Sequence, residues 1–490
     1  MKHLSFSFAF IALLTIAIAP FCSANMSVRE TPLTTIDEYL GKIDGVGETL
    51  LISPDCEHIA LVVKQSGEMG WQIDGKTQKY FSEIGPGYWS PDSKHFAYAA
   101  PDGNKWRLLV DEKGGASFDS VGNAVWSPDS SKISYIAQQN GNYFIIQDNR
   151  KSDAFDAVSY LQYNADGSSL AAIVKKGGKD YLWLDGKLQN SADQIEQFVW
   201  SEHGSHYAFA ARDNASWRVF HDALPGKAVE SVQLLTISPD GMHVAYVGTI
   251  GSGYIAQPGV VNQEQISAKT QLLIADEQTL DSEAGASYTF TGIVYSPDSQ
   301  QLAWTAGYFG QGISAFQATS AGHIETATDG ILKYSNISAP IWSADSQHLA
   351  YGAVQIVGEN IVKYVVTDGK PSEAYFDITQ PVWNPALSQL AYAIVPMDSK
   401  TKSVVINDGQ RSPQYDTVTD LLFSPDGKYF SYLALGDKGP FAVINGIKSP
   451  TYGGFLGNRK SYFDAAGHLH LIMVTKDRQA VHVELSVNAQ

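Results

Sequence analysis

One short phrase returns eleven times along the 490-residue chain and limits what the chain can fold into. Each copy has a large apolar residue, then Ser-Pro-Asp or a close variant, then a run of apolar, small and aromatic residues. The copies begin at Ser53, Ser90, Ser127, Asn164, Ser201, Ser238, Ser296, Ser343, Asn384, Ser424 and Asp464. The first six starts are 37 residues apart, and the later steps are 58, 47, 41, 40 and 40. Fixed periods of roughly 20–50 residues are typical of solenoids, propellers and arrays.

The copy that begins at Ser127 shows what the phrase does. Pro128 presets its own φ for the second position of a type I turn, and Ser127 or Asp129 can accept hydrogen bonds from nearby amides. Six residues after the start, ten of the copies carry a large apolar residue, and the next position is always Ala or Ser. Because alternate residues of a strand face opposite sides, the phrase predicts a strand that packs against a different neighbouring sheet on each face.

The rest of the unit predicts further short strands. The first five copies place an Asp 21 residues after the start, and two of these, Asp74 and Asp185, are followed by Gly, which indicates a tight turn. About four short strands in roughly 40 residues are typical of one propeller blade. Helical periodicity is absent from the body of the chain. The sequence therefore predicts an all-β propeller built from eleven repeats of about 37–47 residues.

The number of rings is a separate prediction. Propellers typically have about four to eight blades, so eleven units favour two rings of about five and six blades over a single large ring, which is the alternative. We expect a first propeller over residues 25–255 and a second over residues 256–490. The last unit lacks a fourth strand, which the segment from Thr35 to Gly45 resembles. The N-terminus is thus expected to complete a blade begun by the C-terminus and to remove a free sheet edge.

The first 24 residues predict export. Lys2 and His3 precede an almost wholly apolar stretch from Leu4 to Phe21, and a small residue, Ala24, follows. This is the pattern of a signal peptide cleaved after Ala24, with an uncleaved membrane anchor as the alternative. No later stretch is long and apolar enough to span a bilayer. After cleavage Cys56 is the only cysteine, so the fold has to hold without an internal disulfide.

Charge excludes one class of partner. The chain has 34 Lys and Arg against 51 Asp and Glu, a net charge of −17. An acidic surface is repelled by phosphate backbones, so we expect no nucleic-acid partner.

The best copies of the phrase resemble a known repeat. They follow Trp89, Trp126, Ile237, Tyr295, Trp342 and Phe423, and they are similar to the repeat of TolB-type, WD-like β-propellers. The resemblance covers nearly all of the mature chain, but its residues build turns and packing. It implies a bacterial protein that is periplasmic or secreted, in a Gram-negative envelope, and that binds other proteins. Fewer than thirty residues separate the predicted cleavage site from the first repeat, too few for the α/β domain of TolB, so TolB's own role in an envelope complex is not implied.

Candidate catalytic and metal-binding patterns are weak. Histidines recur five residues after five of the starts, but other copies carry Lys132, Ser169 or Gln301 there, which favours a solvated strand entrance over a metal belt. His468 and His470 alternate on one strand face, and packing explains them equally well. The chain has no Gly-x-Ser-x-Gly elbow, no glycine-rich phosphate loop and no His-Glu-x-x-His. We therefore expect no catalytic residue, no cofactor and no metal ligand. The recurring histidines are His58, His95, His206, His243 and His348.

A binding face can still be predicted. The Ser-Pro-Asp turns lie on one face of a ring and the next connection of each unit lies on the other, where the loops vary, as recognition loops do. Aromatic residues at loop edges are candidate anchors for a protein, a peptide or a glycan. The leading hypothesis is a non-enzymatic binding module. The alternatives are a carbohydrate lyase or lactonase with a metal near the central channel, and an architectural envelope protein. The candidate anchors are Trp71, Trp106, Trp217, Tyr254 and Tyr308.

Overall fold

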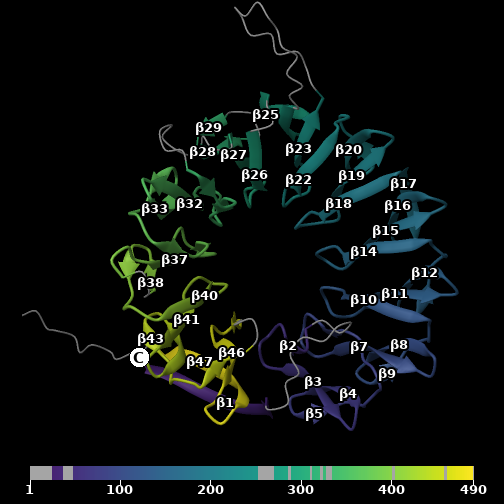
Figure 1. Ribbon diagram of the computed structural model, residues 1–490, viewed down its shortest axis with the longest axis horizontal. Coiled ribbons are helices and arrows are strands. Elements are labelled where there is room, and N and C mark those ends of the chain that lie inside the picture. The colour runs from purple at the N-terminus through teal and green to yellow at the C-terminus, as the bar shows by residue number, and fades with distance from the viewer. Residues whose placement is uncertain are drawn as a thin grey trace, which may run out of the picture.

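The fold is all-β, as predicted. A computed structural model of the chain describes residues 25–36, 48–251, 270–284, 288–308, 312–319, 324–326, 334–399, 403–456 and 461–488. Within these residues every regular element is a strand, and the strands form eleven antiparallel sheets. Figure 1 shows the sheets following one another around a ring in chain order. The described residues contain no helix that could cross a membrane, and the predicted signal peptide lies outside them.

Each regular repeat supplies one sheet of four strands, with its first strand nearest the centre of the ring (Figure 1). The first three sheets contain β2 (Leu50–Ile52), β3 (Ile59–Gln65), β4 (Glu68–Ile73) and β5 (Lys76–Thr77); β6 (Gly87–Trp89), β7 (Phe96–Asp102), β8 (Lys105–Val110) and β9 (Lys113–Gly114); and β10 (Ser120–Trp126), β11 (Ile133–Gln139), β12 (Asn142–Gln147) and β13 (Arg150–Lys151). The next three contain β14 (Ala157–Tyr163), β15 (Leu170–Lys176), β16 (Lys179–Leu184) and β17 (Lys187–Ala192); β18 (Gln194–Trp200), β19 (Tyr207–Asp213), β20 (Ser216–His221) and β21 (Leu224–Pro225); and β22 (Ser231–Ile237), β23 (Val244–Ile250), β24 (Thr270–Ala275) and β25 (Gln278–Ala284).

The later repeats keep the same order with more variation. Their sheets contain β26 (Tyr288–Tyr295), β27 (Gln301–Tyr308), β28 (Gly312–Thr319) and β29 (Ile324–Thr326); β30 (Asn336–Ile337), β31 (Ile341–Trp342), β32 (Leu349–Val357), β33 (Asn360–Thr367) and β34 (Lys370–Pro371); β35 (Asp377–Ile378), β36 (Val382–Trp383), β37 (Leu390–Val395), β38 (Val404–Asn407) and β39 (Gln410–Arg411); and β40 (Thr417–Phe423), β41 (Phe430–Gly436), β42 (Gly439–Ile444) and β43 (Ile447–Lys448). The last sheet contains β44 (Gly454–Phe455), β45 (Ser461–Phe463), β46 (Leu469–Val474), β47 (Gln479–Asn488) and, from the other end of the chain, β1 (Asn25–Thr35).

The second strand of each sheet packs against both neighbouring sheets, as the small and large alternation predicts. On β11, Tyr135 and Ala137 are buried with Leu108 of the preceding sheet. Ile136 faces the other way and is buried with Leu170 of the following sheet. Because each sheet has two apolar faces, it is stable only between neighbours.

The ring closes between the first and last sheets. Leu61 of β3 is buried with Ile472 of β46, and β1 pairs with β47 from Asn25↔Asn488 to Thr35↔Gln479. The N-terminus therefore completes the last sheet, as predicted, but with residues 25–35 instead of the segment from 35 to 45. The ten residues of β47 need an equally long partner, which residues 25–35 supply, and the amide of Ile36 still donates to the carbonyl of Arg478.

The described sheets form one ring instead of two (Figure 1). The predicted boundary at residues 255–256 falls inside a single sheet, because β23 and β24 lie on either side of it and pair directly, with Val247 opposite Leu273. The same sheet then packs on the next one, where Leu273 is buried with Trp304. The long connection after Ile250 is thus an insertion between paired strands and not a linker between rings.

Candidate functional site

The Ser-Pro-Asp turns form a polar network that links neighbouring sheets. The hydroxyl of Ser90 donates to Asp92 Oδ1 at 2.6 Å and accepts the amide of His95 at 2.9 Å. The amide of Asp92 donates to the hydroxyl of Ser130 in the next sheet at 2.9 Å. Cys56 occupies the same turn position as Ser130, with φ 59° against 61°, and is buried. These residues are structural, as their recurrence suggests.

The recurring histidines are each bonded within their own sheet. His95 Nδ1 lies 2.7 Å from Asp111 Oδ2, and its ring stacks on Trp126 of the next sheet with centroids 5.9 Å apart. The other oxygen of Asp111 accepts the amide of Phe96, the first residue of β7. The same pairing joins His58 to Asp74, His206 to Asp222, His243 to Asp276 and His348 to Asp368. Each histidine thus meets a carboxylate of its own repeat and not another histidine of a belt.

Trp71 is not an exposed anchor, so this part of the predicted binding face is wrong. Its side chain is 0 % exposed, and its Nε1 donates to the carbonyl of Gly85 at 3.3 Å. Trp71 lies 18 residues after its repeat start, whereas Trp106 and Trp217 lie 16 after theirs, so its indole sits deeper in the sheet. Gly87 leaves room for it, because a Cβ there would lie 2.9 Å from the indole.

The other predicted anchors are either half-buried or outside the described residues. Trp106 and Trp217 are half-buried, each at the second position of its strand. The guanidinium of Arg212 lies 5.6 Å from the ring of Trp217. Tyr254 lies outside the described residues, and Tyr308 ends β27 with its side chain outside them. Trp106 and Trp217 therefore stay predictions as anchors.

An apolar hairpin tip that the sequence reasoning missed lies on the predicted binding face. At the end of the β32–β33 hairpin, Ile356, Val357 and Ile361 are 63 %, 52 % and 58 % exposed. Ile356 and Ile361 are cross-strand partners, and antiparallel pairing places this tip on the face opposite the Ser-Pro-Asp turns. We call these three residues the β32–β33 tip. The corresponding hairpin ends of the third, fourth and fifth sheets are polar, with Gln139 and Asn142, Lys176 and Lys179, and Asp213 and Ser216.

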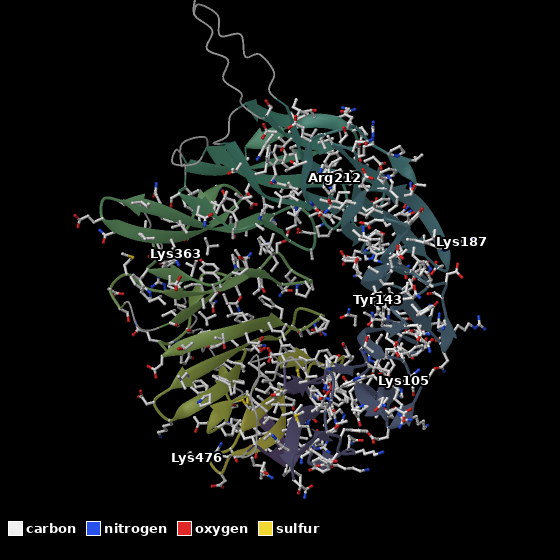
Figure 2. The ribbon with its side chains drawn as sticks, turned by 45° about the vertical axis from the view of Figure 1, so that its right-hand side comes forward. Lys105, Tyr143, Lys187, Arg212, Lys363 and Lys476 are labelled. Atoms are coloured by element: carbon white, nitrogen blue, oxygen red, sulfur yellow. The ribbon has the colours of Figure 1, made fainter. Side chains whose placement is uncertain are left out.

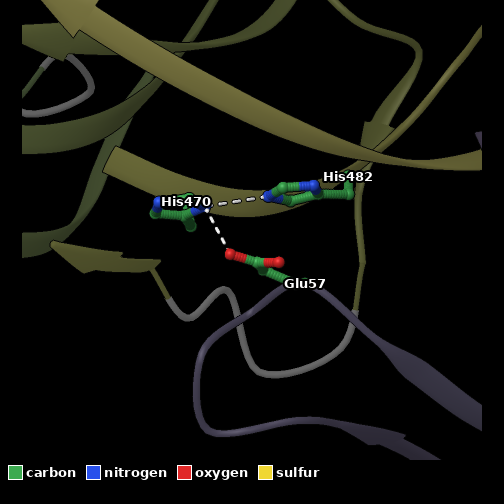
Figure 3. A group of neighbouring side chains, drawn as sticks. All are labelled: Glu57, His470 and His482. Carbon is green, nitrogen blue, oxygen red and sulfur yellow. Dashed lines mark hydrogen bonds and ion pairs between the residues drawn. The ribbon is translucent and has the colours of Figure 1, made fainter. Parts of the chain in front are cut away.

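A buried histidine pair lies at the seam where the ring closes (Figure 3). His470 of β46 and His482 of β47 are 4 % and 8 % exposed, and His470 Nδ1 lies 3.0 Å from His482 Nε2. Glu57, from the first turn of the first sheet, places Oε1 3.4 Å from the same Nδ1. On the other side of the His470 imidazole, Nε2 lies 3.4 Å from Asp464 Oδ2. The imidazoles and carboxylates of this group are side chains that can ligate a metal.

The electrostatics of the seam lower the pKa of two of its groups, His482 and Asp464. Burial lowers the pKa of His482, and the neighbouring His470 lowers it further. Burial tends to raise the pKa of Asp464, but the backbone N–H of His468 and the nearby imidazole of His470 outweigh it and hold that pKa below its ordinary value. The pairing of His470 with Glu57 could not be read from the sequence, because the two residues lie near opposite ends of the chain.

Comparison with known proteins identifies no family for this chain. No protein-family model matches the sequence, and no curated protein matches it. Among solved structures, the chain is similar to an oligogalacturonate lyase in complex with manganese, with 11% sequence identity and a TM-score of 0.28 over 65% of this chain and 98% of that chain. A likeness at this level does not extend to the activity or the metal of that protein.

Proposed function

We propose that this chain is a non-enzymatic binding module that holds a protein or peptide partner on the face opposite its Ser-Pro-Asp turns. The observation that carries the proposal is the exposed aliphatic β32–β33 tip. Three neighbouring aliphatic side chains, each more than half exposed, leave apolar area in water that a partner would cover. Removing such area from water contributes about 25 cal/mol per Å².

The tip is presented on a rigid support. Val362, Val365 and Val366, farther along β33, are buried. Eight cross-strand pairs join β32 to β33 down to Ala350↔Thr367. A support that is already ordered lowers the entropy lost on binding. The hairpin is therefore suited to hold its tip against a partner.

Polar groups border the tip. Lys363, on the same hairpin and labelled in Figure 2, places Nζ 2.5 Å from Oδ1 of Asp377 in the next sheet. The turn between β32 and β33 carries Glu359. An apolar centre with a polar rim is the usual composition of a protein interface. Aliphatic tips favour a protein or peptide over a glycan, because sugar rings are usually held by exposed aromatic faces and hydrogen bonds.

The proposed place of action follows from the N-terminal pattern. Residues 1–24 have the charge and apolar run of an export signal, so the module is proposed to act in the periplasm or outside the cell, in a Gram-negative envelope. Fractionation of cells that express the tagged chain tests this. Recovery in the cytoplasm would contradict it.

Partner capture with matched variants tests the binding face. The double variant Ile356→Ser with Ile361→Ser should lose at least about tenfold of the captured partner, since apolar anchors at an interface each contribute on the order of 1–2 kcal/mol or more. Leu224→Ser is the control, because Leu224 is 75 % exposed but begins an outer strand on the turn face. A second double variant, Trp106→Ala with Trp217→Ala, tests the remaining predicted anchors. Unchanged capture by the first double variant would overturn the choice of the tip.

A further inference from the structure

We propose that Glu57, His470 and His482 form a binding site for one divalent transition-metal ion, with Zn²⁺ as the best fit, across the seam between the first and last sheets (Figure 3). This site is separate from the proposed binding face. It lies on the opposite side of the ring, with the Ser-Pro-Asp turns, where Glu57 follows the first of them.

The spacing of the three donor atoms fits a small ion. His470 Nδ1 lies 3.0 Å from His482 Nε2 and 3.4 Å from Glu57 Oε1, and all three donors lie within 4.8 Å of one another. Ligands held about 2.0–2.2 Å from zinc at tetrahedral angles lie about 3.3–3.6 Å apart. The donor spacing is therefore close to that of a tetrahedral site, and the side chains would rotate to face a common centre.

The protonation of the pair leaves a place for a cation. Two ring nitrogens 3.0 Å apart share a single proton, since two N–H groups cannot face each other at that distance. A divalent ion that replaces the shared proton would take one lone pair from each imidazole and one from the carboxylate of Glu57.

The donor set selects the class of ion. Imidazole nitrogens with one carboxylate suit Zn²⁺ and its neighbours in the transition series, whereas Ca²⁺ and Mg²⁺ prefer oxygen ligands. Two of the three donors here are nitrogens on buried rings. The site should therefore discriminate against Ca²⁺.

Asp464 supplies the support that a ligating histidine usually has. When Nδ1 of His470 binds a metal, the proton lies on Nε2, which is buried, makes no hydrogen bond in the structure and faces Asp464 Oδ2 at 3.4 Å. The other oxygen of Asp464 accepts the amides of Ala466 and His468 at 2.9 and 2.7 Å, which fixes the carboxylate. A carboxylate that orients the second nitrogen of a metal-bound histidine is a recurrent arrangement.

A second group of similar composition shows what the seam has in addition. His206, His221 and Asp222 also bring donors together. One nitrogen of each histidine is already used, because His206 Nδ1 bonds Asp222 at 2.9 Å and His221 Nε2 bonds the carbonyl of Gly241 at 2.8 Å. At the seam, by contrast, the partner of one imidazole nitrogen is another imidazole nitrogen. This second group is therefore a matched control.

Occupation of the site would join the two ends of the chain. Glu57 belongs to the first sheet, and both histidines belong to the last. An ion that binds only the closed ring stabilises it by RT ln(1 + [L]/Kd), about 2.7 kcal/mol at a hundred times Kd.

The test uses the full chain, stripped of metal with a chelator and then titrated with Zn²⁺ or Ca²⁺. We expect one equivalent of Zn²⁺ to remain bound after desalting, with a rise in melting temperature that Ca²⁺ does not produce. His482→Gln should abolish stoichiometric binding, and Asp464→Asn should weaken it by about 10–100-fold. His206→Gln with His221→Gln should bind Zn²⁺ like the parent.

Two further outcomes decide the proposal even if a buried variant folds poorly. Glu57→Gln changes a side chain that is 45% exposed and should fold normally while losing Zn²⁺ affinity. Zn²⁺ binding unchanged in Glu57→Gln and His482→Gln, or lost instead in the His206 and His221 variant, would overturn the site. Because Glu57→Gln leaves the β32–β33 tip intact, partner capture by this variant separates failure of the metal site from failure of the proposed function.

Discussion

The ordinary interface between two sheets and the seam that closes the ring do the same work with different polar groups. Between the second and third sheets, Trp126 Nε1 donates to the carbonyl of Tyr88 at 3.2 Å, and His95 stacks on the same indole. Asp111, in the turn after β8, forms a hydrogen bond with Nδ1 of His95. The same indole bond and histidine stacking recur where His58 meets Trp89 and where His348 meets Trp383.

At the seam these parts are replaced. β47 does not turn after an Asp as β8 does, but runs on for ten residues to pair with β1. His468 therefore meets Asp464 of its own turn at 3.2 Å, and the nearest carboxylate on β47, Glu484, lies 3.8 Å away. The apolar layer is nevertheless of the ordinary kind, with Leu61, Ile472 and their neighbours buried together. The difference teaches that apolar packing is common to all interfaces, while the polar rim depends on where the outermost strand comes from.

Removal of β1 should have the largest effect, because it destabilises the seam and leaves the ordinary interfaces unchanged. A chain without residues 25–35 leaves β47 as an open edge, removes Leu33 from the seam core and removes the hydrogen bond from Tyr452 to Glu30. We expect a loss of at least about 4 kcal/mol in the free energy of unfolding, measured by urea unfolding, together with aggregation through the free edge. A chain that begins at Asn25 is the control. Equal stability of the two chains would mean that β1 does not hold the seam closed.

A pair of core variants should show that the apolar layers are equivalent. Leu61→Ala at the seam and Leu109→Ala at the interface of the first and second sheets each empty a buried site, at 1 % and 3 % exposure. Each should cost about 2–5 kcal/mol by urea unfolding. If Leu61→Ala left the free energy of unfolding almost unchanged while Leu109→Ala lowered it, the seam would be held by its polar groups alone.

Acid should weaken the ordinary turns through carboxylates such as that of Asp345, with the smallest effect of the three predictions. Hydroxyl groups of Ser343 and of Ser388 in the next sheet donate to Asp345 and lower its pKa to about 2. Because the folded pKa lies below the ordinary value of 3.8, the unfolded state takes up the proton first. This contribution is complete above pH 3.8 and is lost as the pH falls through about 2.

The matched position in the last turn is Ala466, which has no carboxylate to titrate. Asp345→Asn should therefore be less stable than the parent at neutral pH, and the difference should shrink as the pH falls from 4 to 2, which urea midpoints at several pH values would measure. A difference that stayed constant with pH would show that Asp345 contributes through its shape and not its charge.

Much of the candidate site was open to sequence reasoning, but some signals went unused. Trp71 stands two residues farther from its repeat start than Trp106, which places it in the core. The recurring His and Asp positions were each visible, yet their pairing appears only when β3 and β4, or β7 and β8, lie side by side. The aliphatic residues around Gly358 and Glu359 also stood out from the polar ends of other hairpins.

The sequence by itself determined the sheets, the turns between their strands, the alternation of packing faces and the closing role of the N-terminus, because each depends on residues close together in one repeat or on an edge that has to be paired. Only the tertiary structure decided that the sheets form a single ring, since the angle between neighbours depends on how side chains fill every interface at once. It alone brought Glu57 to His470 and His482, because residues near opposite ends of a chain meet only after the ring between them has closed.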